Sequence, residues 1–233
     1  GLTAAYRLAI SGHEVTVYDM MEKMGGMLRY GIPQYRLPKE VLDKEIAIIE
    51  KLGVKMINGV KLGKDFTVAS LKAQNDAVIV AVGAWKSSSM RTPGEELDGI
   101  YGGIDFLRAV ALKQEINIGD KVVICGGGNT AMDACRTAVR LGAKEVYCVY
   151  RRTRNEMPAE DIEITEAEEE GVQFKFLTNP ISFNGKDGKV KSVTLQLMEL
   201  GEPDASGRRR PVAIEGKTEE LDVDSVIVAI GQK

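Results

Sequence analysis

A glycine-rich turn at residues 126–131 carries the pattern G-x-G-x-x-A. It follows the short apolar run 121–125 and precedes a segment of helical periodicity at 132–141. In such a turn Gly126 permits a tight bend, Gly128 lets the backbone approach a pyrophosphate, and Ala131 lets the helix pack closely on the strand. The helix N-terminus then faces the phosphates, although the pattern also fits an ordinary glycine turn. The predicted phosphate cradle comprises Gly126, Gly127, Gly128, Asn129, Thr130 and Ala131.

The elements around this turn form a strand–helix–strand unit, and the chain contains two copies of it. Gly1 stands where Ala131 stands, because a helical segment ends at a glycine eleven residues after each (12 − 1 and 142 − 131). Both copies are predicted to close with nearly the same strand, D-A-V-I-V-A-V-G at 76–83 and D-S-V-I-V-A-I-G at 224–231. The sequence therefore predicts an α/β fold with two Rossmann-like dinucleotide-binding domains. The first strand and first two glycines of the first copy would precede Gly1, so we expect this chain to be a piece of a longer protein.

The residues at the ends of the second strands predict different nucleotides for the two copies. Asp19 ends this strand in the first copy, and an acidic residue there accepts hydrogen bonds from ribose hydroxyls, as in FAD or NAD. The second copy has Tyr150 there, followed by Arg151 and Arg152, which suit the 2′-phosphate of NADP(H). Two surface charges at a strand end are the alternative for these arginines. Two different dinucleotides in tandem imply electron transfer between them.

Composition excludes several other classes of protein. The 233 residues are 44% hydrophobic and 28% charged, as in soluble globular proteins, and the net charge of −3 gives no field to gather nucleic acid or anionic lipid. Apolar runs such as 77–84 are strand-sized, so no membrane span is predicted, and the N-terminus lacks a secretory signal. The three cysteines lack the spacing for zinc, a dithiol pair or an iron–sulfur cluster. We expect a reducing, cytoplasmic location and no metal site.

Two domains are predicted, an FAD-binding domain at 1–118 and an NADPH-binding domain at 119–233, with the boundary at Gly119-Asp120. Periodicity and turn residues predict the remaining elements. They are helices at 39–52, 106–112 (capped by Asp105) and 159–170, strands at 54–57 and 172–177, and a hairpin between Asn184 and Glu215.

Specific motifs along essentially the whole chain resemble the small (beta) subunit of glutamate synthase. They are G-G-M-L-R-Y-G-I-P-Q-Y-R-L-P-K at 25–39, the turn at 126–133, Y-R-R at 150–152, M-P-A at 157–159 and G-E-P-D at 201–204. Relatives of that family include the electron-input half of dihydropyrimidine dehydrogenase and the large subunit of ferredoxin–NADP transhydrogenase. The resemblance implies a two-dinucleotide-binding flavoprotein in which NADPH passes hydride to FAD. Electrons then leave through iron–sulfur clusters to a larger catalytic subunit or fused domain.

The resemblance also assigns site residues. It puts the FAD pyrophosphate at Gly1 and the FAD ribose at Asp19, where relatives more often have Glu. Arg151 and Arg152 would clamp the 2′-phosphate of NADPH. No catalytic side chain is nominated, because the protein positions the two reacting rings. Flavin contacts would come from Gly25, Gly26, Leu28, Gly31 and Ile32, the closing turn beside FAD from Ala81, Val82 and Gly83, and the nicotinamide contacts from Ala229, Ile230 and Gly231.

Three parts of the family's proteins have no counterpart in this sequence: the N-terminal cysteine-rich cluster domain, the opening FAD strand and the C-terminal segment that covers the flavin. We therefore expect an FAD domain truncated at both ends, loss of FAD on purification, and no turnover by this piece alone. Iron–sulfur clusters would belong to the missing part or to the partner. The sequence leaves the final electron acceptor open, and a nucleotide-binding module without chemistry of its own is the alternative function. A flavin-dependent disulfide reductase is disfavoured by the lack of C-x-x-C.

Several other polar groups have ordinary explanations. His13 follows a glycine at a helix–strand turn and is expected to be exposed. The cysteines are expected to be small buried residues. Glu166 and Glu168–Glu170 are predicted to form a solvated helix face. Arg208–Arg210 are predicted to be solvated turn charges rather than phosphate contacts.

Overall fold

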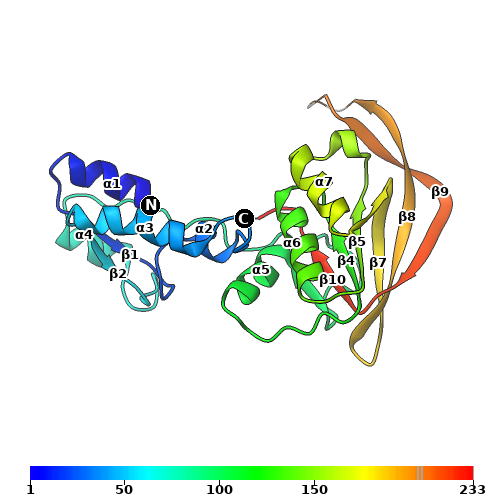
Figure 1. The fold of residues 1–233 in the computed structure, drawn as a ribbon, viewed down its shortest axis with the longest axis horizontal. Helices are drawn as coiled ribbons and strands as arrows, with labels where there is room; N and C mark the ends of the chain where they lie inside the picture. The colour runs from blue at the N-terminus through cyan, green and yellow to red at the C-terminus, as the bar shows by residue number, and fades with distance from the viewer. Residues whose placement is uncertain (204, 206, 233) are drawn as a thin grey trace. The chain divides into compact units, whose positions relative to one another are not determined.

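The computed structural model describes residues 1–203, 205 and 207–232, and the chain divides into two compact units, Gly1–Ala84 and Trp85–Lys233 (Figure 1). Each unit is described by itself. Of the motifs singled out above, Asp204 of G-E-P-D lies outside the described residues. No helix among the described residues is long and apolar enough to cross a lipid bilayer.

The first unit, 1–84, contains a small parallel sheet and four helices. Its strands pair with Val17 opposite Met56, and its core of Met24, Leu42 and Ile46 is small. The helices α1 and α3 form where the glycine-terminated periodic segments predicted them. The elements are α1 (Leu2–Ile10), β1 (Thr16–Tyr18), α2 (Met27–Tyr30), α3 (Lys39–Lys51), β2 (Lys55–Ile57) and α4 (Val68–Gln74).

The segment 76–83 was predicted to be the closing strand of the first copy, and this prediction is wrong. The segment forms no strand, and Ile79, Val80 and Val82 are 60%, 60% and 61% exposed. A strand is held by a ladder of hydrogen bonds to its neighbours, and among the described residues of this unit only β1 and β2 pair as strands. An apolar, β-branched sequence is therefore not sufficient to make a strand here.

The second unit, 85–233, is built on a five-stranded, all-parallel sheet of order β3-β10-β4-β5-β6. Because the strands are parallel, their carboxyl ends meet at one edge, where open α/β sheets bind ligands. A three-stranded antiparallel sheet of order β7-β8-β9 completes the unit. The elements are β3 (Ile100–Gly102), α5 (Gly103–Ala111), β4 (Lys121–Cys125), α6 (Asn129–Arg140), β5 (Glu145–Tyr150), the short 3-10 helix η1 (Arg154–Glu156), α7 (Asp161–Glu169), β6 (Gln173–Phe176), β7 (Thr178–Lys186), β8 (Lys189–Pro203), β9 (Arg209–Asp222) and β10 (Ser225–Val228).

Each face of the parallel sheet is covered by a different layer. Alternate strand residues such as Val122 and Ile124 pack against α5, α6 and α7, while Val123 and Cys125 pack against the antiparallel sheet. Figure 1 shows the helices on one side of the sheet and β7-β8-β9 on the other. Burial on both faces explains why β4 and β5 are nearly continuous apolar runs and were located correctly from sequence.

The structure divides after Ala84, whereas the sequence placed the boundary before Gly119. β3 pairs with β10 through Ile100 and Val226, and α5 contributes Phe106 to the core beneath α6, so both elements belong to the second unit. The predicted cap at Asp105 is also wrong. Gly102 is the N-cap of α5, and Asp105 lies in its first turn, where it accepts a hydrogen bond from Arg108.

The structure corrects the prediction that the glutamates of the acidic helix α7 form a solvated face. The Arg136 guanidinium of α6, only 7% exposed, contacts Glu163 (3.2 Å), Glu166 (2.5 Å) and Glu170 (2.8 Å). Arg140 also pairs with Glu170. The glutamates on this side of α7 therefore fix it to α6, the helix that starts at the glycine turn.

Candidate functional site

The turn after β4 can be made only by a glycine at position 126. Gly126 has φ +152°, and a Cβ atom there would lie 2.3 Å from the carbonyl oxygen of Ala229. The Gly126 amide donates to the Val149 carbonyl (3.1 Å), and the Ala229 amide donates to the Cys125 carbonyl (2.8 Å). The ends of β4, β5 and β10 are thus drawn together around this glycine.

The next two glycines have different surroundings. A Cβ atom on Gly127 would clash with the Tyr150 ring at 2.5 Å, so this glycine makes room for the tyrosine. A Cβ atom on Gly128 would meet nothing closer than Pro158 at 3.8 Å. Gly128 is the N-cap of α6, and its open side leaves room for a ligand at the helix N-terminus. The space beside Gly128 is compatible with the pyrophosphate site that the sequence analysis expects at this turn.

Asn129, Thr130 and Ala131 form the first turn of α6. Ala131 is fully buried. The Asn129 side-chain oxygen accepts from the Glu160 amide (3.2 Å), and the Thr130 hydroxyl oxygen accepts from the Gln232 side chain (3.3 Å). These two hydrogen bonds join the turn to the start of α7 and to the segment after β10.

Ala229, Ile230 and Gly231 follow β10 at the same edge of the sheet. Ala229 is buried against Gly126, Ile230 is 46% exposed, and Gly231 adopts φ +127°. The Gly231 carbonyl accepts from the Ser88 amide at 3.0 Å. The structure therefore brings this predicted nicotinamide segment to the glycine turn.

The two arginines that were predicted to bind phosphate follow β5 and differ in their burial. Arg151 is exposed, whereas Arg152 is only 5% exposed, and its Nε donates to the Arg209 carbonyl at 2.7 Å. Tyr150 is buried, and its hydroxyl donates to the Glu156 carbonyl (2.7 Å). Only the exposed arginine is presented to solvent as a phosphate ligand would be. The hydrogen bond to the Arg209 carbonyl holds the other against the protein.

Glu156 closes the loop after these arginines. Its carboxylate accepts from the Thr153 amide (3.0 Å) and hydroxyl (2.5 Å). The hydrogen bond from Thr153 lowers the pKa of the Glu156 carboxyl, and the charge of Arg209 lowers it further. The hairpin that carries Arg209 therefore lies close to the end of β5, a proximity that separations along the sequence could not reveal.

In the first unit, Gly1 is the N-cap of α1, and a Cβ atom added to it would lie 3.7 Å from the Ala81 side chain. Ala81, Val82 and Gly83 are exposed, and Gly83 has φ +75°. The structure thus brings Gly1 to the segment predicted to form its closing turn.

Asp19 follows β1, as predicted, and is half-buried. Its carboxylate accepts from the Met21 amide at 2.9 Å, and its own amide donates to the Ile57 carbonyl at 3.0 Å. These bonds fix the carboxylate at the carboxyl end of β1, the position expected for a ribose ligand.

The predicted flavin loop at 25–32 is held by two cations that the sequence argument missed. The buried Arg29 donates through Nε to the Met24 carbonyl (2.6 Å) and pairs with Asp43 on α3. Lys39 Nζ donates to the carbonyls of Leu28 (2.8 Å) and Ile32 (2.7 Å). Both cations are visible in the sequence as basic residues of the motif at 25–39. Periodicity could not show which carbonyl groups they would contact.

The glycines of this loop allow its sharp course. Gly25 has φ +130°, and a Cβ atom there would lie 2.9 Å from Leu42. Gly26, at φ +54°, is the N-cap of α2, and Gly31 is buried at its C-terminus. Leu28 is 47% exposed and Ile32 is half-buried, so an apolar surface is available beside the loop.

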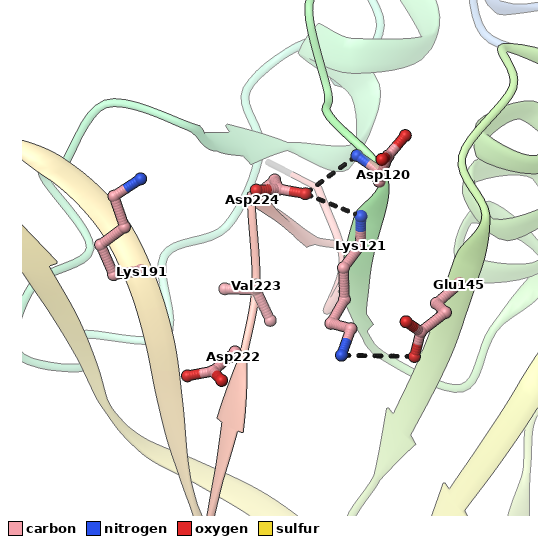
Figure 2. Close-up of a pocket in the computed structure, with 7 residues that line it drawn as sticks. All are labelled: Asp120, Lys121, Glu145, Lys191, Asp222, Val223 and Asp224. Atoms are coloured by element: carbon pink, nitrogen blue, oxygen red, sulfur yellow. Dashed lines mark hydrogen bonds and ion pairs between the residues drawn. The ribbon is translucent and has the colours of Figure 1, made fainter.

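A cavity of about 420 Å³ lies at the opposite, amino edge of the parallel sheet (Figure 2). The Asp224 carboxylate accepts from the amides of Asp120 and Lys121 (both 2.9 Å), and Lys121 pairs with Glu145 at 3.3 Å. These bonds join β10, β4 and β5 at their beginnings. The arrangement is a strand-end cap, away from the glycine turn.

The three cysteines are buried, and no cluster of three or more potential metal-ligating side chains occurs in the described part of the chain. Burial raises the pKa of the Cys125 and Cys135 thiols. These thiols are therefore packing residues of the core.

Comparison with known sequences matches the whole chain, residues 1–233, to the family model described as pyridine nucleotide-disulphide oxidoreductase. The chain is 45% identical over 235 residues to the NADP(+)-dependent formate dehydrogenase subunit beta of Moorella thermoacetica, covering all of this chain and 33% of the relative. It is 38% identical over 245 residues to the glutamate synthase [NADPH] small chain of Escherichia coli, covering 99% of this chain and 52% of the relative. The chain thus spans between a third and about half of the length of these relatives.

Solved structures share the fold. FprA of Mycobacterium tuberculosis in complex with NADPH matches with a TM-score of 0.83 at 21% identity, over 100% of this chain and 68% of that one. Thioredoxin reductase of Lactococcus lactis matches with a TM-score of 0.71 at 20% identity, over 100% and 74%. The predicted two-dinucleotide-binding α/β fold is confirmed by these likenesses. With its glycine turn at the carboxyl edge of a parallel sheet and a family match over its full length, the chain belongs to the pyridine nucleotide-disulphide oxidoreductase family.

Proposed function

We propose that this chain is the electron-input module of a larger oxidoreductase, in which NADPH binds to the second unit and FAD to the first. The observation that carries the proposal is the pair formed by the open Gly128 at the N-terminus of α6 and the exposed Arg151 at the end of β5. A pyrophosphate at the former would place an adenosine ribose toward the latter in the usual Rossmann arrangement.

The absence of an acidic side chain at Tyr150 favours NADPH over NADH. An acidic residue at this position accepts the ribose hydroxyls and repels a 2′-phosphate. Here the tyrosine is buried on Gly127, and the next residue is an exposed arginine. A guanidinium can form paired, charge-assisted hydrogen bonds with a phosphate.

In the first unit, the proposed FAD ligands are Asp19 for the ribose and Gly1 for the pyrophosphate. The loop 25–32 would lie along the flavin, held in shape by Arg29 and Lys39. The residues fit such a ligand, because Asp19 is fixed at a strand end and the loop glycines keep the backbone free of side chains.

When bound, NADPH and FAD would supply the redox chemistry, the transfer of a hydride from the nicotinamide to the flavin. The protein residues bind and orient them. Ala229, packed on Gly126, and Ile230 would form one wall of the nicotinamide site and exclude water from it. No side chain of this chain needs to hold or move a proton in this step.

The partner is proposed to be a larger catalytic subunit or domain that takes the electrons through iron–sulfur clusters. Two of the related proteins are named as beta subunits, of NADP(+)-dependent formate dehydrogenase and of NADPH-Fe(3+) oxidoreductase. Because the relatives are named for formate, iron and glutamate chemistry, the proposal leaves the final electron acceptor open.

The proposal is tested by titrating this chain with NADPH and NADH in a calorimeter and by adding NADPH anaerobically to the FAD-loaded larger protein of which it is proposed to be a part. We expect NADPH to bind more tightly than NADH and to bleach the flavin absorption. Arg151→Ala should weaken NADPH binding by about tenfold to a hundredfold and leave NADH unchanged. Lys186→Ala, which removes an exposed charge from the end of β7, is the matched control.

Equal binding of the two nucleotides by the unaltered chain would contradict the nucleotide assignment. Tight NADPH binding without any bleaching of bound flavin would instead favour a nucleotide-binding module that performs no chemistry of its own.

A further inference from the structure

The basic segment Arg208–Arg210 lies beside the end of β5, although it is separated from it by more than fifty residues in sequence. The link is the hydrogen bond from Arg152 Nε to the Arg209 carbonyl at 2.7 Å. Because Arg152 is buried, this bond ties the end of the β8–β9 hairpin to the strand end proposed to read the ribose.

The side chain of Arg209 also forms hydrogen bonds, which join β9 to β8. The Arg209 side chain donates through Nε to the Gly201 carbonyl (3.0 Å) and through Nη2 to the Leu200 carbonyl (2.5 Å). The two strands of the hairpin are therefore joined by the arginine whose backbone Arg152 holds. Its guanidinium is committed to these carbonyls.

Arg208 and Arg210, the neighbours of Arg209 in sequence, are exposed, as is Arg209 itself. Successive side chains of a strand point to opposite faces, so Arg210 projects from the face of β9 opposite to Arg209. Three exposed arginines, 151, 208 and 210, thus lie on two chain segments that a single buried side chain holds together.

We propose that Arg208 and Arg210 join Arg151 in binding the 2′-phosphate of NADPH, and that Arg152 is the positioning residue that brings the hairpin to this site. The inference rests on the proposed function. A dianionic phosphate has enough acceptor oxygens for more than one guanidinium, and cations from two segments enclose it better than one strand end alone. The 2′-phosphate site would then be formed by residues from both sheets of the second unit.

The test uses the full chain and two probes, adenosine 2′,5′-bisphosphate, which carries the 2′-phosphate, and AMP, which lacks it. Calorimetric titration of the Arg208→Ala/Arg210→Ala double variant should show bisphosphate binding weakened by about tenfold to a hundredfold, with AMP binding unchanged. Lys186→Ala should leave both probes unaffected. Unchanged bisphosphate binding in the double variant would overturn the inference.

The same titrations separate this inference from the proposed function. If the unaltered chain binds the bisphosphate no better than AMP, the NADPH assignment fails and the inference fails with it. If the unaltered chain prefers the bisphosphate, and Arg151→Ala but not the double variant loses the preference, only the inference fails.

The positioning role of Arg152 predicts a selective loss. Arg152→Ala should lose the preference for the bisphosphate and keep AMP binding, and it should reduce the salt dependence of bisphosphate binding as the double variant does. Arg152→Lys, whose ammonium can still donate to the Arg209 carbonyl, should recover part of the preference and serves if the alanine variant fails to fold. Parallel losses for both probes in these variants would show a role in folding alone.

Discussion

The carbonyl oxygen of Ala229 lies 2.3 Å from the point that a Cβ atom on Gly126 would occupy. These residues end two neighbouring parallel strands, β10 and β4, so the closing segment of the unit sits directly on its opening turn. The glycine is required by this contact and by its φ of +152°, before any ligand is considered.

Gly126→Ala should therefore destabilise the second unit by about 1–3 kcal/mol, because the new methyl group overlaps a backbone atom that cannot move freely. Chemical denaturation followed by circular dichroism measures the loss. Gly128→Ala is the matched variant: it should keep nearly full stability, since nothing lies closer than 3.8 Å, but should weaken NADPH binding by filling the open side. Equal stability losses in the two variants would contradict this distinction.

The sequence predicted the second unit better than the first, for a physical reason. β4 and β5 are buried on both faces, so their apolar runs and flanking glycines mark them clearly. The segment 76–83 has almost the same sequence as 224–231, yet only the latter contains a strand, because β10 lies between β3 and β4. Whether the segment forms a strand depends on pairing partners far away in the sequence, and the local sequence pattern does not contain that information.

The sequence predicted the positions of the candidate site residues, but not their burial or their hydrogen-bond partners. The glycine turn and the strand ends came from spacing. The opposite burial of Arg151 and Arg152 did not, because it depends on the Arg209 carbonyl. The Arg136 cluster was missed for the same reason, since its partners lie on another helix.

Arg136→Ala should cost about 3–5 kcal/mol of unfolding free energy, the usual consequence of removing one partner from a buried ion pair. The loss would leave Glu163, whose side chain is 11% exposed, without its cation. Lys144→Ala is the control, because the Lys144–Asp120 pair is 74% and 61% exposed and its removal should change stability little. Comparable midpoints of denaturation for both variants would refute the importance of the buried cluster.

The same cluster should make stability depend on acid pH. Burial opposes the charged form of Glu170, but hydrogen bonds from Arg140 and Arg136 outweigh it and lower the pKa of this carboxyl. A carboxyl whose pKa is lower in the folded than in the unfolded chain, where it is about 4.3, stabilises the fold above that value. This contribution is lost as pH falls through the folded pKa.

Denaturation midpoints measured from neutral pH down to about pH 3 should therefore fall more steeply for the unaltered chain than for Glu170→Gln. The glutamine variant should already be less stable at neutral pH. A variant with an unchanged pH profile would show that Glu170 does not contribute to the acid sensitivity.

Thermal unfolding should show two transitions. The hydrophobic cluster of the first unit contains three buried residues, Met24, Leu42 and Ile46, whereas the second unit has two larger buried clusters on the faces of its parallel sheet. We expect the first unit to melt at the lower temperature, and NADPH to raise only the upper transition, since a ligand stabilises the unit that binds it. A single cooperative transition shifted as a whole by NADPH would contradict this expectation.

The position of β10 constrains the order in which the protein can be completed. Val226 pairs with Ile100 on one side and Val123 on the other, so a strand that follows both of its neighbours by about a hundred residues or more fills the middle of the sheet. Until the ribosome has released this strand, β3 and β4 each present an unpaired edge, and their pairing waits on contacts of long sequence separation. The growing chain is therefore exposed to aggregation until β10 has emerged, and the nucleotide turn at Gly126 becomes complete only when Ala229 reaches it.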